Sequence, residues 1–163
     1  DGSRFGLKIE YLHEEIPLGT GGALKNAENK IADEFLLLNG DTFLPIEYDK
    51  LVAYFHYSNK IGVITIYNNC EKVAPNNTKI GVSNLVVNYN KKNSKGMTHV
   101  DAGAMVFKKK ILNLIPEGQV CSLEENTFCE LIKREEMAAF VAKQQFYDMG
   151  SIKKLEVIKG VLR

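Results

Sequence analysis

Shortages of cysteine, of net charge and of long apolar runs each exclude a class of protein. The three cysteines among the 163 residues show no C-x-x-C spacing, which argues against a disulfide framework and a zinc site. The 21 basic and 20 acidic residues nearly cancel, so no broad electrostatic field favours nucleic acid or an anionic membrane. No apolar stretch approaches the roughly 18 residues that can span a bilayer. We therefore expect a cytoplasmic protein that binds neither nucleic acid nor a membrane.

The sequence also begins without methionine and without the apolar core of a signal peptide. Its first residues, Asp-Gly-Ser, lead directly into an alternating run at 5–11, which predicts a half-buried strand. We expect a chain that opens in this way to be a fragment. The length of 163 residues and the hydrophobic fraction of 45% predict one domain, spanning residues 1–163.

The apolar pattern predicts an α/β fold. Continuous apolar runs predict buried strands at 35–38, 62–67 and 100–107, the first of them a central strand covered on both faces. Helices are predicted at 23–33, 51–57, 108–115 and 122–132. An asparagine-rich stretch at 76–93 predicts a small antiparallel patch. The predicted fold class is a Rossmann-like α/β fold with a mixed, mainly parallel sheet flanked by helices.

Ligands in open α/β sheets bind beyond the carboxyl ends of the strands, and four segments are candidates for such a site. The first is Leu-Gly-Thr-Gly-Gly at 18–22, a loop that feeds the helix predicted from residue 23. Its glycines would let a flat base or sugar ring approach the main chain. A loop that merely needs flexibility explains the same residues equally well, and the segment is neither G-x-G-x-x-G nor a P-loop.

The second segment is Asn-Gly-Asp at 39–41. Asn-Gly between apolar residues also signals a hairpin, which would join the strand at 35–38 to residues 42–44. We favour a ligand site, because the run before it has the composition of a central strand. A carboxylate at such a strand end, that of Asp41, can hold Mg²⁺, which takes oxygen ligands and usually keeps several waters.

The third candidate is Asp148, which follows aromatic residues and precedes Gly-Ser and a predicted helix; a helix cap is the commoner role for such a residue. The fourth combines the lysines at 91–92 with Asp-Ala-Gly at 101–103. Paired lysines on a polar turn are usually only solvated, although they can also grip a phosphate. None of the four segments carries an assignment alone.

Taken in order, these segments resemble the sugar-phosphate nucleotidyltransferases over essentially the whole chain. The most specific parts are Pro-Leu-Gly-Thr-Gly-Gly-Ala at 17–23 and Asn-Gly-Asp at 39–41, followed by the motifs at 101–103 and 148–151. The sequence is most similar to the branch that includes mannose 1-phosphate and heptose 1-phosphate guanylyltransferases. The resemblance implies formation of an NDP-sugar and pyrophosphate from a nucleoside triphosphate and a sugar 1-phosphate, with Mg²⁺ as cofactor, and it allows a homo-oligomer.

The resemblance also implies roles for individual residues. Asp41 and Asp148 would share the catalytic Mg²⁺, and Lys92 would contact the sugar phosphate. Lys92 stands where the family has the lysine of a Glu-Lys-Pro motif. In this sequence residues 91–93 are Lys-Lys-Asn, so the acidic partner and the proline are missing. The other implied substrate contacts are Glu15, Leu18, Gly19, Thr20, Gly21, Gly22, Asn39, Gly40, Asp101, Gly103 and Glu124.

One family motif has no match. Family members open with a strand and a Gly-x-Gly-Thr-Arg-Leu loop that holds the triphosphate, so the N-terminal strand and helix units are expected to be missing here. The strand at 35–38 would then lack a neighbour, which invites aggregation. A non-catalytic regulatory or interaction module would explain the missing loop equally. A metal-dependent glycosyltransferase is the remaining alternative, but it would normally show Asp-x-Asp, whereas Thr-Phe follows Asp41.

Overall fold

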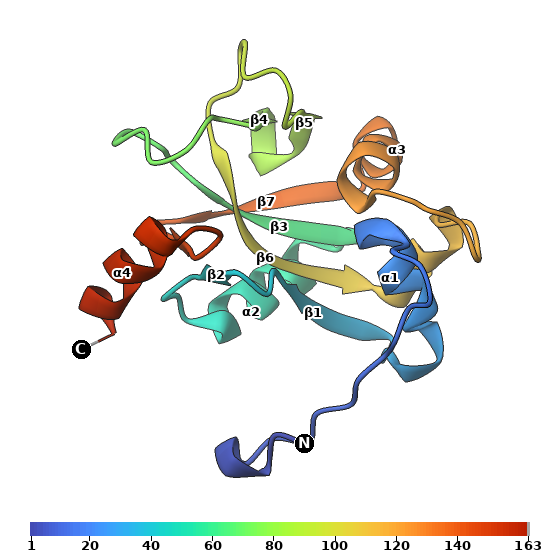
Figure 1. Cartoon of the computed structure of the whole chain (residues 1–163). Helices are drawn as coiled ribbons and strands as arrows, with labels where there is room; N and C mark the ends of the chain where they lie inside the picture. The colour runs from blue at the N-terminus through green and yellow to red at the C-terminus, as the bar shows by residue number, and fades with distance from the viewer. Residues whose placement is uncertain (163) are drawn as a thin grey trace.

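A four-stranded mixed sheet forms the centre of the computed structural model, which describes residues 1–162 (Figure 1). Across this sheet the strands are β1 (Glu34–Leu38), β6 (Val100–Lys108), β3 (Gly62–Tyr67) and β7 (Met137–Ala142). Two smaller sheets pair β2 (Thr42–Phe43) with β8 (Tyr147–Asp148), and β4 (Thr78–Ile80) with β5 (Val86–Tyr89). The α-helices are α1 (Gly19–Asn26), α2 (Tyr48–Ser58), α3 (Phe128–Lys133) and α4 (Ile152–Val161). Shorter helical turns are η1 (Ser3–Phe5), η2 (Glu28–Lys30), η3 (Val82–Asn84), η4 (Lys109–Leu114) and η5 (Leu123–Thr127).

The direction of the strands confirms the predicted α/β class with a mixed sheet. Strand β7 runs parallel to β3, while β6 runs antiparallel to both of its neighbours, β1 and β3. Three of the four strands therefore share one direction, and β6 opposes them. Because β6 lies between β1 and β3, two of the three ladders are antiparallel. The antiparallel pair of β4 and β5 is the small patch that the asparagine-rich stretch predicted.

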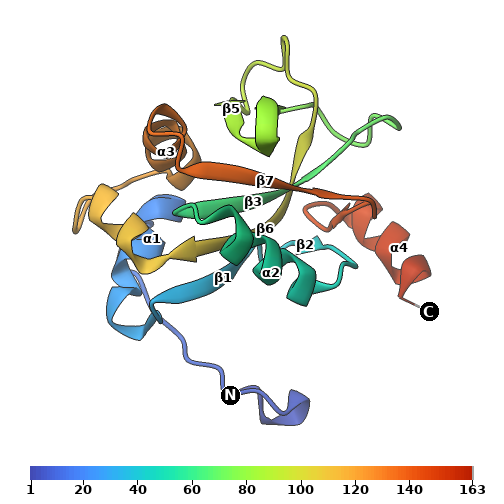
Figure 2. The same ribbon diagram turned by 180° about the vertical axis from the view of Figure 1, so that it is seen from behind.

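Strand β3 is buried along its whole length because helices cover both faces of the sheet. Its Val63 side chain packs with Leu51 and Phe55 of α2 on one face. Figure 2 shows α2 in front of the sheet on this side. Alternation of side chains along a strand sends the next residue, Ile64, to the opposite face.

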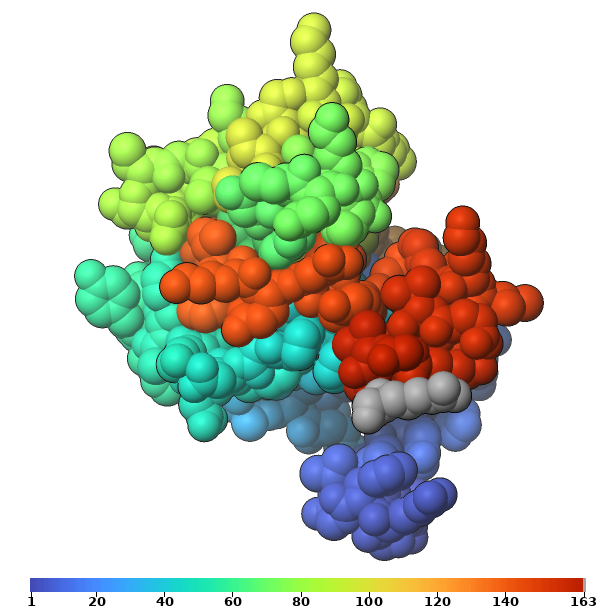
Figure 3. Space-filling view, turned by 90° about the vertical axis from the view of Figure 1, so that its left-hand side faces the viewer, coloured from blue at the N-terminus to red at the C-terminus, as the bar shows by residue number. Residues whose placement is uncertain are grey.

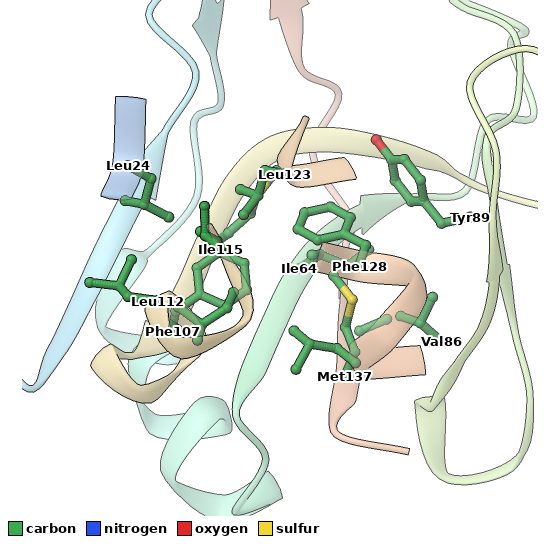
Figure 4. Packing of buried hydrophobic residues seen from close by; sticks show 14 of the residues in the cluster. Leu24, Ile64, Val86, Tyr89, Phe107, Leu112, Ile115, Leu123, Phe128 and Met137 are labelled. Carbon is green, nitrogen blue, oxygen red and sulfur yellow. The ribbon is translucent and has the colours of Figure 1, made fainter. Parts of the chain in front are cut away.

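The opposite face holds the larger hydrophobic cluster, in which Ile64 packs with residues of α1, η5, α3 and β7 (Figure 4). The aromatic rings of Phe107 and Phe128 lie 6.1 Å apart there, and Tyr89 meets Phe128 edge to face at 5.2 Å. This cluster joins the strands to the segment that carries η5, so it fixes one wall of the candidate site.

Strand β1 corrects the prediction of a central strand covered on both faces. Among the described residues it pairs only with β6, and it lies at the edge of the sheet. The side chains of Leu36 and Leu38 are 40% and 50% exposed. A short apolar run shows that a strand forms, but its composition does not show how many of its faces are covered.

The predicted strand at 5–11 is also absent. Residues 6–18 form no helix or strand, and the N-terminal residues stand out from the body of the molecule (Figure 3). Phe5, Leu7 and Tyr11 are 74%, 61% and 69% exposed. An alternating run becomes a strand only when a neighbouring strand accepts its backbone hydrogen bonds, and no strand within residues 1–162 lies alongside this one.

Other predicted elements are confirmed. The helix expected at 51–57 is α2, and the helix expected from 122 begins at η5 after Ser122, whose Oγ accepts a hydrogen bond from the Glu125 N–H at 3.1 Å. The segment expected to be helical at 108–115 forms the 3₁₀ turn η4 instead of an α-helix. Among residues 1–162, no helix combines the length and the apolar character that a membrane crossing requires.

Candidate active site

Asp41 and Asp148 come from distant parts of the sequence and converge beside Gly150. The pairing of strands β2 and β8 places Thr42 opposite Asp148. Asp41, which precedes β2, therefore lies near Asp148, which ends β8. The Met149 N–H donates to the Asp41 carbonyl oxygen at 2.7 Å and fixes this approach. A Cβ on Gly150 would stand 3.0 Å from Asp148 Oδ1 and 3.7 Å from Asp41 Oδ2. Both carboxylates therefore face the same small space, as the sequence analysis predicted.

The Asn-Gly-Asp segment at 39–41 is not a hairpin turn between β1 and β2. Strand β1 pairs with β6 and β2 pairs with β8, so the segment carries the chain from one sheet to another. The Asn39 N–H donates to the Gly103 carbonyl oxygen at 2.9 Å, which ends the β1 ladder. Gly103 has a φ of +78°, and a Cβ there would stand 3.0 Å from Asn39 Nδ2. Gly103 is therefore buried under the segment and does not itself line the adjoining cavities.

A cavity of about 570 Å³ opens between α1, β1 and η5. A second hollow of about 280 Å³ adjoins it and contains the two carboxylates. Asn39, Asp41 and Lys91 line both, so together the two hollows form one cleft. The larger cavity is lined by Thr20, Ala23, Leu24, Ala27, Leu37, Leu38, Asn39, Gly40, Asp41, Lys91, Met105, Leu123 and Glu124. Its wall is mostly apolar with a few polar groups, which suits an organic ligand with a charged end.

Glu124 organises the polar end of the larger cavity. Its Oε1 lies 2.7 Å from Lys91 Nζ, and its Oε2 accepts a hydrogen bond from the Thr20 hydroxyl at 2.6 Å. The Thr20 oxygen in turn accepts from the Leu123 N–H at 2.9 Å. Partial burial acts to raise the pKa of Glu124, but the bonds from Lys91 and Thr20 outweigh it and lower that pKa to about 2. The Glu124 carboxylate is therefore charged and held in a fixed orientation.

Lys91, and not the predicted Lys92, points into the cleft. Lys92 Nζ pairs with Glu125 at 2.7 Å, and the Lys92 side chain is 78% exposed. It lines neither of the two hollows but a third one of about 190 Å³, which shares Lys91 and Glu124 with the larger cavity. The sequence does contain a signal for Lys91. That signal is its place in the paired lysines at 91–92, on the polar turn that follows strand β5.

Asp101 is a half-buried residue that lines the smaller hollow. Its Oδ2 accepts from the Tyr89 hydroxyl at 2.9 Å, and its Oδ1 accepts from the Gly103 N–H at 2.9 Å. Burial raises the pKa of Asp101, although these bonds and the charge of Lys91 counter it. Burial, together with the nearby Asp101 charge, also raises the pKa of Tyr89. Asp101 therefore ties β6 to β5 as well as lining the cleft.

Asp148 is held by two partners. Its Oδ2 lies 2.5 Å from Lys154 Nζ of α4, and its Oδ1 accepts from the Gly150 N–H at 2.6 Å. The Lys154 bond, followed by the Gly150 bond, lowers the pKa of Asp148. The cap of α4 is Ser151, whose Oγ accepts from the Lys154 N–H at 3.4 Å. Asp148 is thus not the cap of the helix that follows it.

The glycine-rich segment corrects a prediction, because its glycines serve packing. They lie inside the first turn of α1, which runs from Gly19 to Asn26 and not from 23 to 33. The N–H groups of Gly21 and Gly22 donate to the Cys121 carbonyl oxygen at 2.8 and 3.2 Å. A Cβ on Gly22 would stand 2.8 Å from the Gln119 carbonyl oxygen. The backbone of residues 119–123 therefore fills the space that side chains at Gly21 and Gly22 would need.

Other predicted contacts are divided between the cleft and the surface. Of the segment 18–22, only Thr20 lines the larger cavity, and Leu18 donates its N–H to Glu14 Oε2 at 3.2 Å. Glu15 is exposed and lines neither hollow. The structure thus brings together Thr20, Asn39, Gly40, Asp41, Asp101, Glu124 and Asp148. The other predicted residues line neither of these two hollows, namely Glu15, Leu18, Gly19, Gly21, Gly22, Lys92 and Gly103, although Lys92 lines the adjoining hollow of about 190 Å³.

The chain is similar to known proteins over most of its length. The sequence profile described as nucleotidyl transferase matches residues 1–160. The chain is 31% identical over 156 residues to mannose-1-phosphate guanylyltransferase of Mycobacterium tuberculosis, covering 93% of this chain and 43% of that protein. It is 30% identical over 145 residues to D-glycero-alpha-D-manno-heptose 1-phosphate guanylyltransferase of Campylobacter jejuni, covering 89% and 63%. The chain therefore spans less than two thirds of the length of these curated relatives.

A solved structure agrees with the sequence relatives. HddC from Yersinia pseudotuberculosis, crystallised with GMP-PN, superposes with a TM-score of 0.76 at 25% sequence identity. The superposition covers 96% of this chain and 68% of that one.

Proposed function

Because the chain belongs to the nucleotidyl transferase family, we propose that this protein transfers a nucleoside monophosphate from a nucleoside triphosphate to a sugar 1-phosphate, releasing pyrophosphate. One observation carries the proposal: the carboxylates of Asp41 and Asp148 meet at the mouth of a cavity of about 570 Å³. Carboxylates in that position suit a reaction of phosphate groups, because they can hold a cation between the protein and the ligand.

The donor set fits Mg²⁺. Asp41 Oδ2 and Asp148 Oδ1 offer oxygen ligands close to one point, and carboxylate oxygens suit Mg²⁺ better than a softer metal. Mg²⁺ is commonly held by one or two carboxylates together with waters and substrate phosphate oxygens. When bound, the ion would neutralise phosphate charge as pyrophosphate leaves.

The residues of the chain would bind and orient the two substrates. The apolar side chains of Leu24, Leu37 and Met105 offer a surface for the base or the sugar ring. Lys91 would hold the attacking sugar phosphate, and the fixed carboxylate of Glu124 would accept hydrogen bonds from sugar hydroxyls. A phosphate oxygen of the sugar then attacks the α-phosphorus in line, and the bond from that phosphorus to pyrophosphate breaks. The protein needs no nucleophile of its own, so positioning and charge neutralisation supply the catalysis.

The relatives support a narrower substrate class. Two of them are guanylyltransferases that act on mannose 1-phosphate or a heptose 1-phosphate, and the HddC structure holds a guanine nucleotide analogue. We propose GTP and a 1-phosphate of mannose or a heptose as the substrates. Three free cysteines support a reducing, cytoplasmic location. Homo-oligomer formation, which the resemblance allows, stays a prediction for sizing in solution.

The decisive experiment measures pyrophosphate release from purified protein with four nucleoside triphosphates, several sugar 1-phosphates and Mg²⁺. In a form that also carries a Gly-x-Gly-Thr-Arg-type loop we expect release with GTP and a mannose or heptose 1-phosphate, reduced about a hundredfold or more by Asp41→Asn. Residues 1–163 alone, without that loop, are expected to release none. Absence of release with every pair would favour the non-catalytic module. Release of nucleoside diphosphate from a nucleotide sugar would favour the glycosyltransferase alternative.

A further inference from the structure

Lys154 of α4 occupies one oxygen of the carboxylate that the proposed cation would need. Its Nζ lies 2.5 Å from Asp148 Oδ2, while Asp148 Oδ1 already accepts the Gly150 N–H. The partner carboxylate differs: Asp41 accepts only the Thr42 hydroxyl, at 3.2 Å, among the described side-chain bonds. One of the two carboxylates is therefore free to bind, and the other is engaged.

A fixed positive charge at this position has two opposed effects. It offsets the repulsion between the two neighbouring carboxylates, so it stabilises their close approach. It also repels a cation that binds at Asp148 Oδ1. We propose that Lys154 is a positioning residue that holds Asp148 through Oδ2 and moves away from it when a divalent cation binds at Oδ1, because the two positive charges repel each other. This inference rests on the magnesium site of the proposed function.

The attachment of α4 makes such a withdrawal feasible. Of its residues, only Ile158 is buried, while Ile152 and Val157 are 83% and 56% exposed. The described ties at its start are the Ser151 cap and the ion pair between Lys154 and Asp148. Because coupling between two binding events is reciprocal, a cation that displaces Lys154 also weakens the attachment of α4.

The first test is a titration of the purified protein with Mn²⁺, followed by electron paramagnetic resonance of the free ion. We expect Lys154→Met to bind Mn²⁺ about twofold to fivefold more tightly than the wild type, the range for a partly exposed ion pair. Lys154→Arg keeps the charge and is expected to match the wild type. Lys153→Met is the matched control, since Lys153 is the preceding exposed lysine and forms no ion pair among the described residues.

Each outcome of this titration supports or overturns the role of Lys154, the metal site or the proposed reaction. Equal or weaker Mn²⁺ binding by Lys154→Met, with wild-type binding that Asp148→Asn abolishes, would overturn the role of Lys154 and leave the metal site standing. No Mn²⁺ binding by any variant would overturn both. Tighter binding by Lys154→Met in a protein that releases no pyrophosphate would support Lys154 and reject the proposed reaction.

The second test follows α4 directly by hydrogen exchange. In the wild type, saturating Mn²⁺ is expected to speed exchange of the amides in residues 152–161, because the ion pair that ties the helix is lost. In the Lys154→Met variant, amide exchange in residues 152–161 is expected to be fast without Mn²⁺ and to stay the same when Mn²⁺ is added. Slower exchange in the wild type on Mn²⁺ binding would overturn the proposed antagonism.

Discussion

The glycine-rich segment at 18–22 and the Asn-Gly-Asp segment at 39–41 are equally conspicuous in the sequence but serve the molecule differently. In the first, glycines let the backbone of residues 119–123 approach α1, and a Cβ on Gly22 would meet a carbonyl oxygen at 2.8 Å. In the second, a Cβ on Gly40 would meet nothing within 4 Å, and Asp41 faces the cleft. The comparison teaches that a missing side chain can make room for the protein itself as readily as for a ligand.

The largest expected effect falls on the second segment. Asp41→Asn is expected to reduce pyrophosphate release by about a hundredfold or more, because a metal ligand contributes several kcal/mol to such transition states. Its thermal unfolding is expected to stay within about 2 °C of the wild type, since the Asp41 side chain is exposed and its only described bond is to Thr42. Steady-state assay and calorimetry measure the two quantities. A large fall in melting temperature would mean that Asp41 belongs to the packing.

The next effect falls on the first segment and is a loss of stability. Gly22→Val is expected to lower the free energy of unfolding by about 2–3 kcal/mol, because the added methyl groups overlap Leu18 and the Gln119 carbonyl. Gly40→Ala is the matched control, with an expected change of less than about 1 kcal/mol. Urea denaturation compares the two variants. Equal stabilities would break the contrast between the segments.

A smaller effect separates the two adjacent lysines. Lys91→Met is expected to raise KM for the sugar 1-phosphate about tenfold, which corresponds to loss of one charge-assisted hydrogen bond to phosphate. Lys92→Met is expected to stay within about twofold, because its side chain lies 78% exposed beside Glu125. Initial rates at varied sugar 1-phosphate test the pair. The reverse ranking would restore Lys92 to the role that the family pattern implied.

The smallest effect is a pH dependence of stability that belongs to Glu124. Its pKa is about 2 in the folded protein and 4.5 ordinarily, so the stability it contributes is present above pH 4.5 and is lost as pH falls towards 2. Since its partner Lys91 is half exposed, the contribution is expected to be about 1 kcal/mol. Wild type and Glu124→Gln should therefore differ by that amount at pH 6 and converge near pH 2 in urea denaturation. A constant difference across this range would assign the effect to another group.

The sequence predicted the parts of the fold that depend on local pattern. Strands β3 and β6, helix α2 and the Ser122 cap follow from apolar spacing and capping chemistry, and each is present. The run at 35–38 was correctly expected to be a strand, but its place at the edge depends on which segments lie beside it. The same reason explains residues 5–11, which have the pattern of a strand and no neighbouring strand.

For the site, too, the sequence predicted some residues and missed others. The approach of Asp41 and Asp148 follows from strand ends that meet, and the family resemblance indicated the pair. The sequence offered both Lys91 and Lys92 as candidates, and the family motif favoured Lys92; which of the two lines the cleft depends on how the turn after β5 folds. The packing role of Gly22 depends on Gln119, nearly a hundred residues away, and no local pattern reports that contact.

The position of β6 sets the order in which the molecule can form during synthesis. Among the described strands, β1 and β3 leave the ribosome before β6, yet neither pairs with the other; both take residues 100–108 as their partner. The described four-stranded sheet therefore forms only after β6 has emerged, and β7 at 137–142 completes it later still. Because pairing over such sequence separations is slow, the apolar side chains of two early strands wait without a partner while the chain grows. The step that protects the nascent chain is the arrival of β6.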